Sequence, residues 1–147
     1  MAKQKVWMVT GSSRGLGRAL ADEILAHGDK LVATARKPGD LAPLAEKYGD
    51  AVCTVSVDVR EAKQVEAAVA LAVEAFGRVD VLVNNAGITI PGAIEELSLA
   101  QVKAVFETNF FGVVRMTQAT LPVMRRQAVI RTDIDRNSSP EPFIDSV

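Results

Sequence analysis

The sequence predicts an α/β fold, a doubly wound parallel sheet with helices on both faces. Short apolar runs rich in valine alternate along the chain with segments of helical period. The first of these runs is followed by a glycine-rich turn, Thr10 to Gly17, which opens a helix. Strands that alternate with helices favour parallel pairing through right-handed crossovers, and we expect the strand order 3-2-1-4.

Four strands are expected where the chain is apolar and β-branched over a few residues, as in strands buried on both faces. They are residues 5–9, 31–35, 52–57 and 79–83. The fourth is expected at an apolar edge of the sheet, because no strong strand pattern follows it. A short fifth strand over residues 128–132, or a second chain, would cover this edge; a marginally stable fragment is the third alternative.

Helices are expected between the strands, over residues 18–27, over 41–47 and from Asp58 to Phe76. Gly28 and Gly77 supply stop signals for the first and third of them. Asp58 and Glu61 have the spacing of a capping box at the start of the third helix.

A fourth and longest helix is expected to start at the capping box of Ser98 and Gln101, and Pro122 is expected to kink or end it. Its apolar stripe has helical period and consists of Val102, Val105, Phe106, Phe110, Val113 and Met116. Residues 1–127 are therefore predicted as one domain and 128–147 as an irregular, mobile tail with two prolines. A deletion, frameshift or alternative splice after Gln127 is our hypothesis for this change of character.

Composition excludes several classes of function. The net charge is −1, so no basic surface is expected to recruit nucleic acid or an anionic membrane. The apolar runs are far shorter than a membrane span, and residues 1–5 lead into a strand without the apolar stretch of a secretory signal. The single cysteine, Cys53, lies in an apolar run without metal-ligand spacing. We expect it to be buried in a cytoplasmic protein that has no metal site.

The glycine-rich turn is the strongest functional signal, because a turn between a strand and a helix can hold a phosphate at the helix N-terminus. There the unpaired N–H groups and the helix dipole both favour an anion. Three glycines allow the backbone to approach a pyrophosphate without Cβ contacts. This predicts a Rossmann-like dinucleotide site, and an ordinary strand-to-helix turn is the alternative.

Four motifs, in order, resemble those of the short-chain dehydrogenase/reductase family. The turn Thr10–Gly17 is similar to the family's T-G-x-x-x-G-x-G fingerprint, and Asn84–Gly87 is similar to its N-N-A-G motif. Asp58 and Val59 resemble its adenine-contacting pair, and Asn109 resembles its helix asparagine. The resemblance covers residues 3 to about 127. It implies an oxidoreductase that moves hydride between a nicotinamide dinucleotide and an alcohol or carbonyl, often as a dimer formed through the long helix.

The resemblance also implies a catalytic serine and a Y-x-x-x-K pair, and this sequence departs from that pattern. Tyr48 is its only tyrosine, Val52 stands four residues later, and the last lysine is Lys103. Ser138 and Ser139 are not assigned to the serine role, since the preceding residues are too charged for a buried strand. Roughly the second half of the family's length is missing, so we expect a truncated chain that is inactive alone.

Asn109 is the one residue of the family's catalytic set that this sequence retains. The resemblance implies that it bends the helix and supports a water leading to the catalytic lysine. Because that lysine is absent, we predict a structural role for Asn109, with the relay role as the alternative.

The basic residues Arg14 and Arg36 indicate the cofactor. Sites that prefer NAD usually place a carboxylate at the end of the second strand, where this chain has Arg36 and Lys37. Guanidinium groups pair with phosphate bidentately, so we predict NADP(H) in preference to NAD(H). Solvated surface charges are the alternative. The predicted cofactor-binding residues are Gly11, Ser13, Arg14, Gly15, Leu16, Gly17, Arg36, Asp58, Val59, Asn85, Ala86 and Gly87.

Three hypotheses of function follow from these observations. The first is an NADP(H)-dependent oxidoreductase of the family's kind. The second is a nucleotide-binding module without chemistry, acting as a homo-oligomer or paired with a full-length homologue. The third is a non-functional truncation product. The substrate is not predicted, because the family builds that pocket mainly from the half that this sequence lacks.

Overall fold

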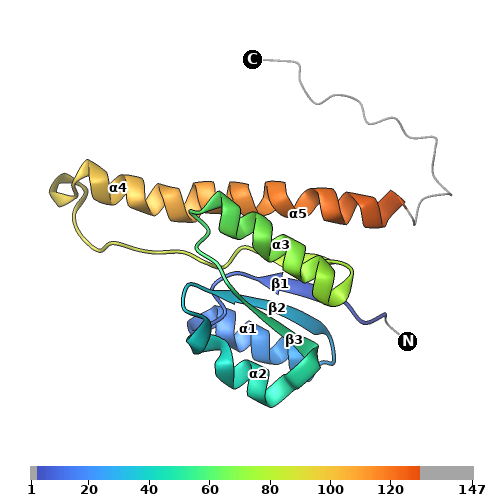
Figure 1. Ribbon diagram of the computed structural model, residues 1–147. Helices are drawn as coiled ribbons and strands as arrows, with labels where there is room; N and C mark the ends of the chain where they lie inside the picture. The colour runs from blue at the N-terminus through green and yellow to red at the C-terminus, as the bar shows by residue number, and fades with distance from the viewer. Residues whose placement is uncertain (1–2, 130–147) are drawn as a thin grey trace.

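A computed structural model describes residues 3–129 of the chain and contains a four-stranded parallel sheet (Figure 1). The strands are β1 (Val6–Val9), β2 (Lys30–Ala35), β3 (Val52–Ser56) and β4 (Val81–Val83). All three neighbouring pairs are parallel, and the order is β3-β2-β1-β4. The predicted fold class and strand order are confirmed, and β4 lies at an edge of the described sheet.

Helices cover both faces of this sheet (Figure 1). One face carries α1 (Gly15–Ala26) and α2 (Ala42–Tyr48), and the other carries α3 (Ala62–Phe76) and α5 (Gly112–Val129). The helix α4 (Leu99–Phe106) precedes α5 and is joined to it by a π-helical segment, Glu107–Phe111. Short 3-10 turns occupy Pro38–Leu41, Gly49–Ala51 and Ile94–Glu96.

Successive strand residues point to opposite faces and fill two separate cores. Met8 and Val32 pack with α3 and with Met116 of α5, while Val9 and Leu31 pack with α1 and α2. Burial on both faces explains why the central strands β1 and β2 are nearly continuous apolar runs. Because the faces of the sheet are apolar, polar residues lie at its carboxyl edge.

The start of β4 is anchored by polar side chains. Val6 N–H donates to Asp80 Oδ2 (2.9 Å), and the Arg78 guanidinium pairs with the same carboxylate. The Gln127 amide of α5 bonds both the N–H and the C=O of Val79, each at 2.9 Å. This amide pairs with Val79 as a neighbouring strand would, and it ties α5 to the sheet.

Asp80 makes this anchor sensitive to acid. Burial alone would raise the pKa of Asp80, but the Arg78 guanidinium and the Val6 N–H outweigh it and hold the pKa below its ordinary value. The contribution to stability is therefore complete above the unfolded-state pKa, about 3.9, and is lost as pH falls through the folded-state pKa.

Asp80→Asn is therefore expected to cost about 1–3 kcal/mol of unfolding free energy at pH 7, because a part-buried ion pair is broken. The difference from wild type should shrink at pH 3, because that pH lies below the unfolded-state pKa and the stabilising contribution of the carboxylate declines there. Urea unfolding at both pH values measures this, with Asp40→Asn on an exposed turn as the control. A difference that is equal at the two pH values would contradict the anchor.

The predicted capping box at Asp58 and Glu61 is wrong. The helix α3 begins at Ala62, its N-cap is Glu61, and no side chain caps it. The Asp58 carboxylate is instead bound by Arg60, and the Asp58 N–H donates to Gln64 Oε1 (2.9 Å). The Asp58 carboxylate thus accepts from the backbone N–H and the side chain of Arg60, and not from the N–H groups of the helix. The second capping box, of Ser98 and Gln101, is confirmed.

The long fourth helix differs from its prediction in two ways. It begins after Ser98 as expected, but the π-helical segment interrupts it before α5 starts at Gly112. Pro122 does not end α5, which continues to Val129. Its neighbours Thr120 and Val123 are buried, so packing holds the helix across the position where proline removes one backbone hydrogen bond.

The boundaries of the first helix and of the last predicted strand also differ. The helix α1 starts at Gly15, inside the glycine-rich turn, rather than at residue 18. Ala128 and Val129 belong to α5, so a strand beginning at residue 128 is wrong. The remaining expectations for the tail, residues 130–147, lie outside the described residues. Over residues 3–129, no helix is long and apolar enough to cross a membrane.

Candidate dinucleotide site

The glycine-rich turn connects β1 to α1 and is packed against the loop that follows β4. Gly11 and Gly15 adopt positive φ angles of 70° and 58°, which favour glycine. A Cβ on Gly17 would lie 2.1 Å from the Gly11 carbonyl oxygen and 2.4 Å from Asn85 Nδ2. This position therefore excludes any side chain, because a Cβ would overlap these two atoms.

A set of hydrogen bonds fixes these two loops together. Thr10 Oγ1 accepts from the backbone N–H groups of Asn85 (3.0 Å) and Ala86 (2.9 Å). In return, Asn85 Nδ2 donates to the carbonyl oxygens of Thr10 and Gly11, both at 3.0 Å. The start of α1 has no side-chain cap and no acidic residue in its first turn. Its terminal N–H groups are therefore available to an anion.

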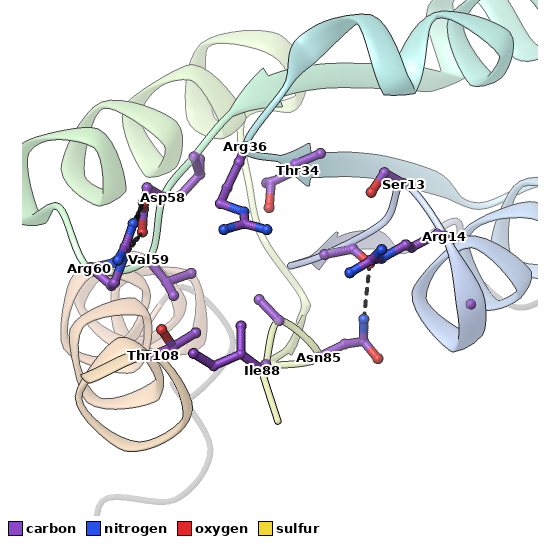
Figure 2. Close-up of a pocket in the computed structure, with 16 residues that line it drawn as sticks. Ser13, Arg14, Thr34, Arg36, Asp58, Val59, Arg60, Asn85, Ile88 and Thr108 are labelled. Atoms are coloured by element: carbon purple, nitrogen blue, oxygen red, sulfur yellow. Dashed lines mark hydrogen bonds and ion pairs between the residues drawn. The ribbon is translucent and has the colours of Figure 1, made fainter. Parts of the chain in front are cut away.

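These loops form one wall of a pocket of about 340 Å³ at the carboxyl edge of the sheet (Figure 2). Ten of the twelve predicted cofactor-binding residues line it: Gly11, Ser13, Arg14, Gly15, Arg36, Asp58, Val59, Asn85, Ala86 and Gly87. Leu16 and Gly17 do not. Leu16 is 84% exposed, and Gly17 is buried.

The charges in this pocket are predominantly positive. Three arginines line it, and Figure 2 shows the Arg14 and Arg36 side chains reaching into it from different walls. Asp58 is the one carboxylate among the lining residues, and Arg60 binds it with Nη2 to Oδ2 at 2.6 Å. The Arg60 hydrogen bonds hold the pKa of Asp58 below its ordinary value, with smaller help from the Arg36 charge. An anion entering the pocket meets Arg14 and Arg36 without a competing free carboxylate.

A family model for short chain dehydrogenase matches residues 5–131. The chain belongs to the short-chain dehydrogenase family. It is 45% identical over 124 residues to the oxidoreductase BOA17 of Botryotinia fuckeliana, covering 84% of this chain and 45% of that protein. This chain thus spans about half the length of the curated relatives it matches.

Solved structures of the family show the same fold. The 3-ketoacyl-(acyl-carrier-protein) reductase from Brucella melitensis complexed with NADH is 32% identical, with a TM-score of 0.82 over 86% of this chain and 53% of that one. The alcohol dehydrogenase from the archaeon Thermococcus sibiricus complexed with 5-hydroxy-NADP is 34% identical, with a TM-score of 0.79 over 84% of this chain and 55% of that one.

Asn109 holds the loop after β4 in this family member. Its side chain accepts from Ile88 N–H and donates to Ile88 C=O, both at 2.8 Å, from the middle of the π-helical segment. Asn109 itself is exposed. It also borders a second hollow, of about 330 Å³, with Arg14, Gly87 and Thr89. These two hydrogen bonds hold the backbone of Ile88 in place.

Several lining residues were not predicted from the sequence: Thr34, Ala35, Val57, Arg60, Ile88 and Thr108. Most of them follow from the topology, because they neighbour predicted residues at the carboxyl ends of β2, β3 and β4. Thr108 comes from the π-helical segment, and no sequence pattern places it there. Arg60 is the only charged residue among these six. The one sequence feature that could have indicated it is its position two residues after Asp58.

Proposed function

We propose that this chain binds NADP(H) in the pocket and forms the cofactor-binding part of a short-chain oxidoreductase of alcohols or carbonyls. The observation that supports it is the pair Arg14 and Arg36 in a pocket where the one carboxylate among the described lining residues is already bound by Arg60. An NAD-preferring site would carry a carboxylate at the end of β2, and this chain has Arg36 there. Relatives bind either type of dinucleotide, so the choice rests on these side chains.

The groups that line the pocket suit the separate parts of a dinucleotide. The uncapped start of α1 offers N–H groups to the pyrophosphate, and Gly11 lets the backbone approach it closely. Asp58 and Val59 line the part of the pocket beyond β3, where the adenine would lie. Arg36 would pair with the 2′-phosphate. When bound, the nicotinamide would supply hydride transfer.

We further propose that these 147 residues bind the cofactor without turnover. Reduction of a carbonyl needs a proton donor for the developing alkoxide, and the sequence has no Y-x-x-x-K pair to provide one. A second candidate function is therefore a binding module paired with itself or with a full-length homologue. The exposed side chains of Phe106 and Phe110, 56% and 55% accessible, favour such pairing. A cytoplasmic location remains part of this proposal.

Titration of the purified chain with NADPH, followed by a panel of carbonyl substrates, tests the proposal. Tight NADPH binding without turnover is the expected result. Turnover would contradict the proposed lack of catalysis. No binding of NADPH, or equally tight binding of NADH at the same salt concentration, would contradict the proposed cofactor.

A further inference from the structure

Arg60 belongs to none of the motifs that point to the site, yet it lines the pocket. We infer that Arg60 is a specificity-determining positioning residue, which holds the Asp58 carboxylate and so leaves Arg36 free for the 2′-phosphate of the dinucleotide. This inference rests on the proposed binding of NADP(H). It concerns the choice between NADPH and NADH, and not binding as such.

Arg60 binds the Asp58 carboxylate through several hydrogen bonds. Arg60 Nε lies 2.9 Å from Oδ1 and 3.1 Å from Oδ2, and Nη2 lies 2.6 Å from Oδ2. The backbone N–H of Arg60 also donates to Oδ1, at 3.0 Å. Bidentate pairing of this kind fixes the orientation of the carboxylate as well as its charge.

Arg36 is the alternative partner for this carboxylate. Ala35 and Ser56 are register partners of β2 and β3, Val57 N–H donates to Ala35 C=O (2.9 Å), and the Ser56 hydroxyl donates to Arg36 C=O (3.1 Å). Arg36 and Asp58 thus leave adjacent strand ends. The Arg36 charge already contributes to the lowered pKa of Asp58.

Within residues 3–129, the other acidic groups near Arg60 do not draw it away from Asp58. Glu61 and Glu107 both help to raise the pKa of Arg60, but the Asp58 hydrogen bond is the largest cause. Glu107 is itself paired with Arg115, with Nη2 to Oε1 at 2.5 Å. Without Arg60, the Asp58 carboxylate would be ionised beside Arg36, and a 2′-phosphate would have to displace it. NADH has no phosphate at that position and would bind as before.

The test compares the dissociation constants of NADPH and NADH in Arg60→Ala, in Asp58→Asn/Arg60→Ala and in wild type. Arg60→Ala is expected to weaken NADPH about two- to fivefold relative to NADH, because a competing ion pair at a partly exposed site is worth up to about 1 kcal/mol. The double variant removes the competing carboxylate and should restore the wild-type ratio. Taking the ratio cancels any loss of adenine contacts, which both dinucleotides share.

Lys37→Ala is the matched control, because Lys37 is a neighbouring exposed cation that does not line the pocket. Arg60→Gln provides a second variant, and circular dichroism checks that each variant is folded. If the wild type prefers NADPH and both Arg60 variants keep the wild-type ratio of dissociation constants, the inference is overturned and the proposed function stands. Failure of the double variant to restore the ratio also overturns it. A wild type that binds neither dinucleotide overturns both.

Discussion

Gly17→Ala is expected to destabilise the chain strongly and to weaken NADPH binding. The added Cβ would lie 2.1 Å from the Gly11 carbonyl oxygen, a backbone atom, and 2.4 Å from Asn85 Nδ2. The clash with Gly11 can be relieved only if the glycine-rich turn itself opens, and the clash with Asn85 only if the turn and the loop after β4 also move apart. That movement breaks the Asn85 hydrogen bonds to the carbonyl oxygens of Thr10 and Gly11.

The expected loss is about 3 kcal/mol, at the upper end of the cost of overpacking a core, because backbone rather than a flexible side chain must shift. For a domain of this size, such a loss lowers the melting temperature by about 10 °C. The same shift displaces the N–H groups at the start of α1, so residual folded protein should bind NADPH weakly. Thermal unfolding and calorimetric titration measure the two effects separately.

Gly39→Ala is the control for this substitution. Gly39 lies in the exposed turn before α2, its φ is not positive, and a Cβ there would have no atom within 4 Å. It should unfold at the wild-type temperature and bind NADPH normally. If Gly17→Ala behaved like Gly39→Ala, the close packing of the two loops would be disproved.

Much of this arrangement was predictable from local patterns. The central strands β1 and β2 are buried on both faces, so each is a nearly continuous apolar run, and alternation with helices predicts parallel pairing. Most of the candidate site was predictable for the same reason, because motifs at the ends of β1, β3 and β4 meet at one edge of the sheet.

The remaining features depend on competition that spacing alone does not reveal. Asp58 and Glu61 have the spacing of a capping box, but Arg60 binds the Asp58 carboxylate instead. Pro122 usually marks the end of a helix, but burial of Val123 keeps α5 intact. The π-helical segment allows Asn109 to reach Ile88, a contact between residues distant in the sequence. In the first case a closer local pair, and in the other two a tertiary contact, outweighs the preference that the spacing indicates.

Arg36→Asp is expected to reverse the cofactor preference, the second large effect. It removes the cation at the end of β2 and places a carboxylate where NAD-preferring sites carry one. That carboxylate would repel the 2′-phosphate of NADPH and accept a hydrogen bond from the ribose 2′-hydroxyl of NADH. A charge-assisted bond contributes about 1.5–3 kcal/mol, so the NADPH-to-NADH affinity ratio should fall about 100-fold.

Competition titrations with both dinucleotides at one salt concentration measure this ratio. Lys37→Asp makes the same change of charge one residue further along the chain, at a residue that does not line the pocket. It therefore distinguishes a direct contact of residue 36 with the phosphate from the effect of net charge alone. A direct contact predicts a large change for Arg36→Asp and a small, salt-screened change for Lys37→Asp. Equal changes in the two variants would mean that Arg36 acts only through net charge. No change in either would show that the phosphate does not lie at the end of β2.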